Sequence, residues 1–304
     1  MRVFLTGGTG QVGRALIAGK PAETVLLAPT RAELDLGDAN AVRESVLAFD
    51  ADLIINAAAY TAVDKAESEP EAARRVNVGL VEALVRAVDV GTLDEKPIVH
   101  LSTDFVFDGA ASQPYTPDAP TDPLGVYGRT KRDGEIVMRG APCHLILRTA
   151  WVYAARGENF VHTMLRLMRE RVEVRVVADQ IGTPTHAAGL ARAIWRLVPG
   201  IEHIGRVAGS PILHWTDAGA ASWYDFAVAI QEEALALGLL EHAVPVVPIR
   251  TKDYPTPAQR PSYGVLDKSA TWAVTGPARH WRVELRDCLR EIAAARVSPN
   301  ARSA

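Results

Sequence analysis

Near its start the chain passes from a short apolar run through Thr6-Gly7-Gly8-Thr9-Gly10-Gln11-Val12-Gly13 into an amphipathic stretch. The glycines at positions 7, 10 and 13 have separate tasks in a strand-to-helix turn that binds a pyrophosphate. Gly7 permits the tight turn, Gly10 lets the backbone approach the phosphates, and Gly13 lets the helix pack closely on the strand. The helix N-terminus adds oriented N–H donors and the positive end of its dipole. Because the pattern lies between a strand and a helix, it predicts a dinucleotide-binding domain.

Short apolar runs alternate with amphipathic stretches through roughly the first half of the chain. This alternation is typical of a parallel sheet that is covered by helices on both faces. We expect strands at Arg2–Thr6, Thr24–Ala28, Leu53–Asn56, Ile98–Thr103 and His144–Thr149. We expect helices at Gln11–Lys20, Asp38–Phe49, Pro70–Val90 and Val126–Met138. The predicted fold class is therefore α/β, a doubly wound parallel sheet of the Rossmann type.

The alternation loosens after about residue 150, and a proline-rich stretch at 254–261 interrupts the C-terminal third. We therefore expect a dinucleotide-binding domain at 1–150 and a smaller, mostly helical substrate lobe at 151–304, with segments that can be exchanged between them. An earlier proline-rich stretch, Gln113–Pro123, predicts a loop at the edge where the strand carboxyl ends open. Loops at that edge form the ligand sites of doubly wound sheets.

The composition excludes some classes of partner. The 304 residues are 48% hydrophobic, enough for a large core, and their formal net charge is −3. Because this charge leaves no broad basic face for a phosphate backbone, we expect no nucleic-acid partner. No run of about 18 apolar residues and no signal peptide is visible, so we expect a cytoplasmic protein without a membrane partner. The two cysteines, Cys143 and Cys288, belong to no metal-binding motif, and we expect no metal site from them.

The end of the second expected strand bears on the choice of cofactor. It lacks the acidic residue that would hold the adenosine ribose of NAD. Arg31 follows it, and a guanidinium can pair with the 2′-phosphate of NADPH. Asp35 and Leu36 come next and can flank the adenine. The residues therefore favour NADPH, with NADH as a second accepted cofactor; the alternative is that Arg31 is a solvated loop charge.

A tyrosine and a lysine open the last expected helix of the first domain, in Tyr127-Gly128-Arg129-Thr130-Lys131. Their spacing puts both side chains on one helical face. The ordinary pKa of a phenol is about 10, and a neighbouring ammonium lowers it by stabilising the phenolate. We therefore expect Tyr127 to exchange a proton with the substrate, and Lys131 to lower the pKa of Tyr127 and hold the nicotinamide ribose.

A hydroxyl group is expected at the same sheet edge, because Leu101-Ser102-Thr103-Asp104 ends the fourth expected strand. Thr103 can hydrogen-bond a carbonyl oxygen while Tyr127 gives it a proton and a hydride reaches the carbonyl carbon. Thr103, Tyr127 and Lys131 are thus the predicted catalytic residues of a reductase. The alternative for Thr103 is a threonine that caps the turn after the strand.

With these residues in place, the chain resembles the extended short-chain dehydrogenase/reductases and, within them, the dTDP-4-dehydrorhamnose reductases. The resemblance runs almost from end to end. It is carried by Thr-Gly-Gly-Thr-Gly-Gln-Val-Gly at 6–13, Asn-Ala-Ala-Ala-Tyr-Thr-Ala-Val-Asp-Lys-Ala-Glu at 56–67, Ser-Thr-Asp-Phe-Val-Phe-Asp-Gly at 102–109, Val-Tyr-Gly-Arg-Thr-Lys at 126–131, Arg-Thr-Ala-Trp-Val-Tyr at 148–153, Asp-Gln-Ile-Gly-Thr-Pro-Thr at 179–185 and Tyr-Pro-Thr-Pro-Ala-Gln-Arg-Pro at 254–261. The blocks at 56–67, 148–153 and 254–261 are the most specific to this reductase group.

The resemblance implies NAD(P)H-dependent reduction of dTDP-4-dehydro-6-deoxy-L-mannose to dTDP-L-rhamnose, the last step in supplying rhamnose for cell-surface polysaccharide. It assigns Gly10, Gln11 and Val12 to the cofactor pyrophosphate, Asp35 and Leu36 to the adenine side, and Ala59, Tyr60 and Thr61 to the nicotinamide half. It assigns Thr103 and Asp104 to the sugar, Tyr127 to proton donation, Lys131 to the ribose and Trp151 to packing on the substrate. It also implies Mg²⁺ at the interface of a homodimer, for which no ligand cluster is evident in the sequence.

Two residues of the second lobe suit a nucleotide sugar, which has an apolar sugar face and a doubly charged pyrophosphate. An indole fits the first and a guanidinium the second. Trp151 follows the fifth expected strand, and Arg260 lies in the proline-framed loop, so we expect both to bind substrate. The alternative is structural: Trp151 fills the seam between the lobes, and Arg260 pairs with a nearby carboxylate.

Two other functions suit the same fold. One is another sugar-nucleotide reductase or epimerase, or a dehydratase; dehydration is disfavoured because Thr103 is followed by Asp104-Phe105 and not by the Asp-Glu pair that such enzymes use. The other is a non-catalytic regulatory subunit of methionine adenosyltransferase. The presence of Thr103, Tyr127 and Lys131 together argues against a site without catalysis.

Overall fold

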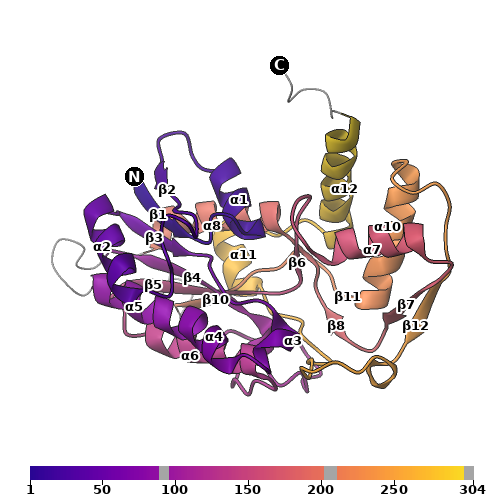
Figure 1. Cartoon of the computed structure of the whole chain (residues 1–304), viewed down its shortest axis with the longest axis horizontal. Helices are drawn as coiled ribbons and strands as arrows, with labels where there is room; N and C mark the ends of the chain where they lie inside the picture. Colours follow the sequence, from indigo (N-terminus) through magenta and orange to yellow (C-terminus); the bar gives the residue numbers. More distant parts are fainter. Residues whose placement is uncertain (89–95, 202–210, 298–304) are drawn as a thin grey trace.

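A large parallel sheet covered by helices lies beside a smaller lobe built mainly from helices (Figure 1). The computed structural model describes residues 1–88, 96–201 and 211–297. The sheet and its helices come mostly from the first half of the chain, and the smaller lobe from the second half. The predicted fold class, a doubly wound α/β sheet with a smaller lobe, is confirmed.

The large sheet has six strands, all parallel, in the order β10-β5-β4-β3-β1-β2. They are β1 (Arg2–Thr6), β2 (Val25–Leu27), β3 (Leu53–Asn56), β4 (Ile98–Thr103), β5 (His144–Thr149) and β10 (Ile212–His214). β1, β3, β4 and β5 have the bounds expected from the sequence, and β2 is shorter than expected. β2 pairs with one side of β1 and β3 with the other, so the strand order reverses at β1. Ligands of doubly wound sheets bind at the carboxyl ends of the strands at such a reversal.

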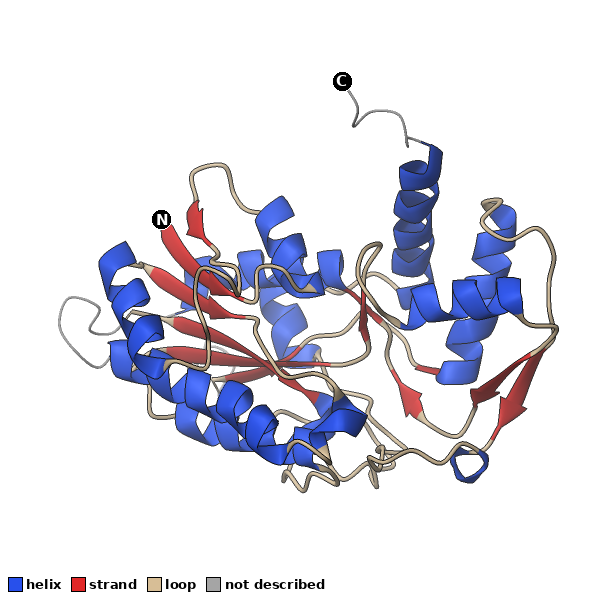
Figure 2. Cartoon of the chain, viewed as in Figure 1, coloured by secondary structure: helices blue, strands red, loops and turns tan. Residues whose placement is uncertain are grey.

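Helices cover both faces of this sheet (Figure 2). One face carries α2 (Ala39–Phe49), α5 (Leu80–Val88) and α6 (Val126–Met138), and the other carries α1 (Gln11–Ala18), α8 (Ala187–Leu197) and α11 (Ser269–Thr275). Strand residues are apolar on both sides for this reason: Ile54 packs in the first layer, and its neighbours Leu53 and Ile55 pack in the second.

The segment expected as one helix over Pro70–Val90 is divided. It consists of α4 (Pro70–Arg74), a π-helical turn (Arg75–Gly79) and α5, and a short helix α3 (Val63–Ala66) precedes it. The last two residues of the expected helix lie outside the described residues. Single π-helical turns inside helices occur frequently at functional sites.

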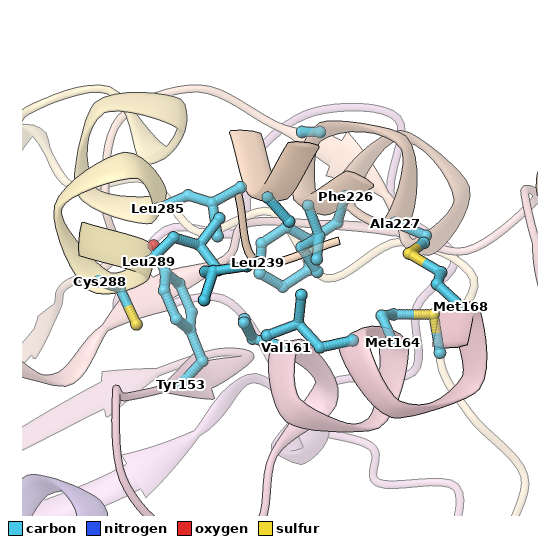
Figure 3. Close-up of a cluster of buried hydrophobic side chains, with 14 of the residues drawn as sticks. Tyr153, Val161, Met164, Met168, Phe226, Ala227, Leu239, Leu285, Cys288 and Leu289 are labelled. Atoms are coloured by element: carbon cyan, nitrogen blue, oxygen red, sulfur yellow. The ribbon is translucent and has the colours of Figure 1, made fainter. Parts of the chain in front are cut away.

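The smaller lobe has α7 (Phe160–Glu170), α10 (Trp223–Ala236) and α12 (Trp281–Val297) around its own apolar core. Phe226 and Leu289 lie in this core with Met164 and Met168 of α7 (Figure 3). Short strand pairs accompany the helices: β6 (Val152–Tyr153) with β9 (Thr185–His186), β7 (Val174–Val177) with β12 (Val246–Ile249), and β8 (Ile181–Gly182) with β11 (Ala221–Ser222). Single 3₁₀ turns lie at Asp104–Val106, Val198–Gly200 and Thr251–Asp253.

Three segments from the second half of the chain lie on the large sheet: α8, β10 and α11. β10 pairs with β5 at the sheet edge, and α8 packs on α1, where Trp195 Nε1 donates a hydrogen bond to the Leu16 carbonyl at 3.1 Å. The chain therefore passes back and forth between the smaller lobe and the sheet, with α7, α10 and α12 in the lobe and α8, β10 and α11 on the sheet. The division into domains at residue 150 stays a prediction. These segments follow residue 150 in the sequence but pack with the sheet of the first domain.

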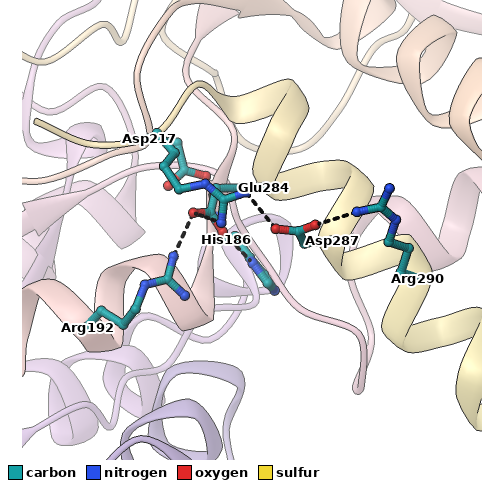
Figure 4. A network of polar contacts seen from close by, with 7 residues as sticks. His186, Arg192, Asp217, Glu284, Asp287 and Arg290 are labelled. Carbon is teal, nitrogen blue, oxygen red and sulfur yellow. Dashed lines mark hydrogen bonds and ion pairs between the residues drawn. The ribbon is translucent and has the colours of Figure 1, made fainter.

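A polar network ties α12 to α8 (Figure 4). The Glu284 carboxylate lies 3.1 Å from His186 Nδ1 and accepts a hydrogen bond from Arg192 at 2.6 Å. Asp217 accepts a hydrogen bond from the His186 backbone N–H at 2.8 Å. Because Glu284 is buried, these partners supply the compensation that its charge requires. Within the described part of the chain, no helix is long and apolar enough to cross a membrane.

Candidate active site

The glycine turn forms an open cradle at the carboxyl end of β1. Gly7 has φ +75°, a conformation that favours glycine, and its carbonyl accepts a hydrogen bond from the Gly10 N–H at 2.9 Å. A Cβ at Gly13 would lie 2.1 Å from the Gly7 carbonyl oxygen, so only glycine lets α1 approach the turn this closely. No side chain caps the first turn of α1, which leaves its N–H groups to bind an anion. These residues fit the pyrophosphate of a dinucleotide.

The two residues after this cradle have different surroundings. The Gln11 amide donates a hydrogen bond to the Val152 carbonyl at 3.4 Å and accepts one from Asn159 Nδ2 at 2.9 Å. Its side chain thus ties the turn to the smaller lobe, and its backbone N–H is the group left for a phosphate. Val12 packs into the core between α1 and α8, so its part in cofactor binding is also limited to its backbone.

The residues expected at the adenine end lie on the loop after β2. Arg31 is exposed, and no hydrogen bond or ion pair holds its guanidinium within the described ranges. Asp35 accepts a hydrogen bond from the Gly37 N–H at 2.9 Å, and Leu36 packs on the core under α2. Arg31 is therefore free to meet a 2′-phosphate.

The loop that contains Ala59, Tyr60 and Thr61 is fixed by Asn77, a residue that the sequence analysis missed. Asn77 is buried in the π-helical turn. Its side chain accepts a hydrogen bond from the Tyr60 N–H at 2.8 Å and donates one to Thr130 Oγ1 at 3.0 Å. Asn77 therefore holds the expected nicotinamide loop against α6.

Tyr127 and Lys131 lie on one face of α6, as their spacing predicts. Tyr127 is half-buried and meets Phe105 edge to face, with 5.5 Å between the ring centroids. Lys131 is buried, and its Nζ donates a hydrogen bond to the Leu101 carbonyl of β4 at 2.6 Å. Both side chains therefore lie at the edge where β4 ends.

Burial shifts the pKa values of both Tyr127 and Lys131. Burial raises the pKa of Tyr127 to about 12, and the hydrogen-bonding Thr103 hydroxyl only partly opposes this. Burial also lowers the pKa of Lys131 to about 8, while the Glu135 carboxylate raises it. Lys131 is not among the groups that shift the pKa of Tyr127 in this arrangement, in which its ammonium binds the Leu101 carbonyl, and the expected lowering of the Tyr127 pKa by Lys131 stays a prediction. A phenol with a raised pKa keeps its proton at neutral pH, as a proton donor must.

Thr103 and Asp104 lie at the end of β4, shortly after Leu101, whose carbonyl binds Lys131. Thr103 Oγ1 accepts a hydrogen bond from the Phe105 N–H at 3.2 Å and donates one to Asp104 Oδ1 at 3.1 Å. Thr103 thus caps the 3₁₀ turn and also lies beside the Tyr127 phenol. Asp104 Oδ2 is buried without a partner among the described residues, and burial raises the pKa of Asp104 to about 7.

Trp151 lies between two parts of the smaller lobe. Its ring stacks on Trp223, with 3.5 Å between the centroids and 9° between the planes. A Cβ at Gly182 would lie 2.6 Å from Trp151 Cε2. Trp151 also has φ +46°, which non-glycine residues rarely adopt and which is typical of functional sites. The structure thus places Trp151 on the core of the smaller lobe, held by Trp223, a residue that the sequence analysis did not find.

Arg260 pairs with a carboxylate from the first half of the chain. Its guanidinium donates hydrogen bonds to Asp64 Oδ1 at 3.0 Å and to Asp64 Oδ2 at 2.8 Å. Asp64 Oδ1 also accepts a hydrogen bond from the Ala258 N–H at 3.2 Å. The structural alternative for Arg260 is therefore realised in this arrangement, and its contact with substrate stays a prediction.

The Mg²⁺ ion implied by the resemblance has no support in the described residues. Across residues 1–88, 96–201 and 211–297, no group of three or more His, Cys, Asp or Glu side chains could hold a metal ion. Glu284, which lies 3.1 Å from His186 Nδ1, is paired with Arg192 and Arg279.

A phosphate-binding turn and a Thr-Tyr-Lys group at one edge of a doubly wound sheet define a dinucleotide-dependent oxidoreductase of the short-chain dehydrogenase/reductase class. The family model described as "RmlD substrate binding domain" matches residues 1–294. The chain belongs to this family, that of the dTDP-4-dehydrorhamnose reductases. It is 41% identical over 300 residues to the dTDP-4-dehydrorhamnose reductase of Burkholderia thailandensis, across 96% of this chain and 99% of that protein.

Solved structures agree with this assignment. A dTDP-4-dehydrorhamnose reductase from Clostridium acetobutylicum has a TM-score of 0.87 and 34% identity, and the match covers 96% of this chain and 99% of that one. The dTDP-4-dehydrorhamnose reductase of Bacillus anthracis, in complex with NADP, has a TM-score of 0.86 and 31% identity over 95% of this chain and 99% of that one. A relative of this chain thus binds NADP.

Proposed function

We propose that this chain reduces the 4-keto group of dTDP-4-dehydro-6-deoxy-L-mannose (dTDP-4-dehydrorhamnose) with NADPH, giving dTDP-L-rhamnose. One observation supports this most: the Thr103 hydroxyl and the Tyr127 phenol lie together at the end of β4, and Lys131 is buried on the same face of α6 as the phenol. The relatives that carry this name, from Burkholderia thailandensis and Escherichia coli among others, support the substrate.

The residues of the site divide the work of a carbonyl reduction. When bound, NADPH supplies the hydride. The Thr103 hydroxyl turns its proton from Asp104 Oδ1 to the ketone oxygen, Tyr127 Oη donates a hydrogen bond to the same oxygen, and Tyr127 gives it a proton as negative charge develops there. Tyr127 holds its proton at neutral pH, as any phenol with an ordinary pKa of about 10 does, and burial raises the pKa of this phenol further, to about 12. Lys131 holds the nicotinamide ribose from its position at the Leu101 carbonyl.

The same structure suggests which groups of the protein bind the cofactor. The uncapped N–H groups of α1 hold the pyrophosphate, and Arg31 pairs with the 2′-phosphate. This pairing makes NADPH the preferred cofactor over NADH.

The substrate groups come from both halves of the chain. Asp104 meets the sugar beside Thr103, and Trp151 packs on the apolar sugar face. Arg260 turns from Asp64 to the substrate pyrophosphate, which offers two charges where Asp64 offers one.

A substrate panel tests the proposed function. The parent protein and Tyr127→Phe are mixed with NADPH and with dTDP- or UDP-linked 4-keto-6-deoxysugars, and NADPH absorbance is followed. We expect rapid oxidation with dTDP-4-dehydrorhamnose, formation of dTDP-rhamnose, and loss of both in Tyr127→Phe. Turnover of a UDP-linked ketosugar at the same or a higher kcat/KM would overturn the substrate, and absence of turnover with every ketosugar would overturn the function.

A further inference from the structure

The catalytic face of α6 continues beyond Lys131. Tyr127, Lys131 and Glu135 are spaced four residues apart, so their side chains lie on one side of the helix. Tyr127 and Lys131 belong to the site described above. The Glu135 side chain does not reach that site. It is buried between α6 and the strands β4 and β5.

Glu135 binds both strands that lie below α6. Its Oε1 accepts a hydrogen bond from Ser102 Oγ of β4 at 2.5 Å and from Arg148 Nε of β5 at 2.9 Å. Its Oε2 accepts one from Arg148 Nη2 at 2.7 Å. Two parallel hydrogen bonds between a guanidinium and a carboxylate fix both distance and orientation. One helical side chain thus sets the position of α6 on β4 and β5 together.

The strand residues that bind Glu135 are direct neighbours of the catalytic strand end. Ser102 pairs with Arg148 in the register of β4 and β5, and the next pair is Thr103 with Thr149. Arg148 is itself held in place: its Nη1 donates a hydrogen bond to the Pro117 carbonyl at 3.1 Å, and its guanidinium lies over the Phe107 ring, 5.0 Å from the centroid. Glu135 is therefore anchored one residue away from Thr103, on a fixed partner.

Stability alone is a poor explanation for this ion pair. Both side chains are 1% exposed, so both charges lose their hydration. Replacing a buried ion pair by apolar side chains of similar size is often neutral or stabilising, whereas a fork of hydrogen bonds specifies one geometry. An apolar replacement of the pair can therefore keep the stability of the protein and remove only the fixed geometry, which makes a geometric role testable.

We propose that Glu135 is a positioning residue for the reductase: through Ser102 and Arg148 it holds α6 so that Tyr127 faces Thr103 across the ketone oxygen. This rests on the proposed roles of Tyr127 and Thr103. Hydride transfer depends on placing these two hydroxyl groups within hydrogen-bond reach of one oxygen, and small displacements cost rate heavily. Substrate binding through the smaller lobe does not depend on Glu135.

The test separates position from stability with a double variant. Glu135→Leu/Arg148→Met removes both charges and keeps apolar volume, so its melting temperature stays within about 4 °C of the parent. We expect its kcat to fall at least about tenfold, with KM for the ketosugar changed less than about threefold. The matched control is Glu233→Leu/Arg286→Met, which removes a bidentate pair of the same kind between α10 and α12. It keeps the parental kcat.

A stable Glu135→Leu/Arg148→Met variant with the parental kcat overturns the proposal. If this variant does not fold, Ser102→Ala decides, because it deletes one hydrogen bond to Glu135 and leaves the ion pair. A fall in kcat of about threefold at an unchanged KM supports the proposal, and an unchanged kcat overturns it. Tyr127→Phe is assayed beside them: if it is active, the proposed function fails, and if it is inactive while the double variant is not, only the positioning role fails.

Discussion

Arg260 and Asp64 join the proline-rich loop at 254–261 to α3 through two hydrogen bonds of 2.8 and 3.0 Å. The pair connects segments almost two hundred positions apart in the sequence. The Asp64 side chain is 41% exposed and Arg260 is 26% exposed, so solvent reaches this pair and its contribution to stability is small. The guanidinium can therefore exchange its partner at little cost.

Asp64→Asn and Arg260→Ala separate the two roles of Arg260. If Arg260 binds the substrate pyrophosphate, Arg260→Ala weakens the ketosugar by about 1–3 kcal/mol and raises its KM by about tenfold or more. Asp64→Asn removes the competing carboxylate, so KM stays at the parental value or falls. Steady-state kinetics with NADPH in excess measure both. An equal rise of KM in the two variants would mean that the pair only shapes the loop.

Gly182→Ala is expected to displace Trp151, the residue proposed to pack on the substrate sugar. The new Cβ would lie 2.6 Å from Trp151 Cε2, so the indole has to move. This movement disturbs its stacking on Trp223. We expect KM for the ketosugar to rise by about fivefold or more, while the Kd for NADPH is unchanged. Gly200→Ala is the control, because among the described residues, its chain neighbours aside, no atom lies within 4 Å of a Cβ there. A parental KM in Gly182→Ala would remove Trp151 from the substrate site.

The buried Asp104 carboxyl predicts a particular pH dependence of stability. Its pKa is raised from the ordinary 3.8 to about 7 by burial, so the folded protein holds a proton that the unfolded chain has lost in this range. The free energy of unfolding therefore falls as the pH rises from about 4 to about 7, by up to about 4 kcal/mol from this group. Asp104→Asn removes this fall.

Urea unfolding at pH 4.5 and pH 8 measures the effect in the parent protein, in Asp104→Asn and in the exposed control Asp122→Asn. The control keeps the parental difference between the two pH values, and Asp104→Asn reduces it. An identical difference in all three proteins contradicts a protonated Asp104.

Arg31→Ala is expected to narrow the preference for NADPH. The exposed guanidinium has no partner of its own within the described residues, so its removal deletes a charge-assisted contact and costs no packing. We expect the Kd for NADPH to rise by about tenfold and the Kd for NADH to stay the same. Arg171→Ala, an exposed arginine of the smaller lobe, leaves both constants unchanged. Equal affinities of the parent protein for the two cofactors would contradict the prediction.

The local patterns of the sequence predicted the first domain well. β1, β3, β4 and β5 are short apolar runs that end in glycine or polar residues, and such signals lie within a few positions of one another. β10 was missed because it has only three residues, Ile212–His214, and owes its strand conformation to pairing with β5. The break in the helix at Arg75–Gly79 had no signal of its own, since a π-helical turn depends on the contacts of Asn77.

In the candidate site too, the sequence predicted the local patterns but not the features that depend on tertiary contacts. The glycine turn and the spacing of Tyr127 and Lys131 are visible in one stretch of sequence each. The raised pKa of Tyr127 and the anchoring of Lys131 at Leu101 depend on which strand lies under α6. Glu135 had a usable signal, because it continues the spacing of Tyr127 and Lys131 by one further turn. Its partner Arg148 could not be foreseen, since only the sheet register brings it there.

The central claim is that Tyr127 gives its proton to the ketone oxygen of a dTDP-linked sugar. The most direct measurement is a single-turnover reaction of enzyme-bound NADPH with dTDP-4-dehydrorhamnose in the parent protein and in Tyr127→Phe, with the Kd for NADPH determined for each by fluorescence. Since the variant keeps the ring and loses the proton, the rate constant falls by about a hundredfold or more and the Kd stays within about twofold. A Tyr127→Phe protein that oxidises NADPH at nearly the parental rate would contradict the account.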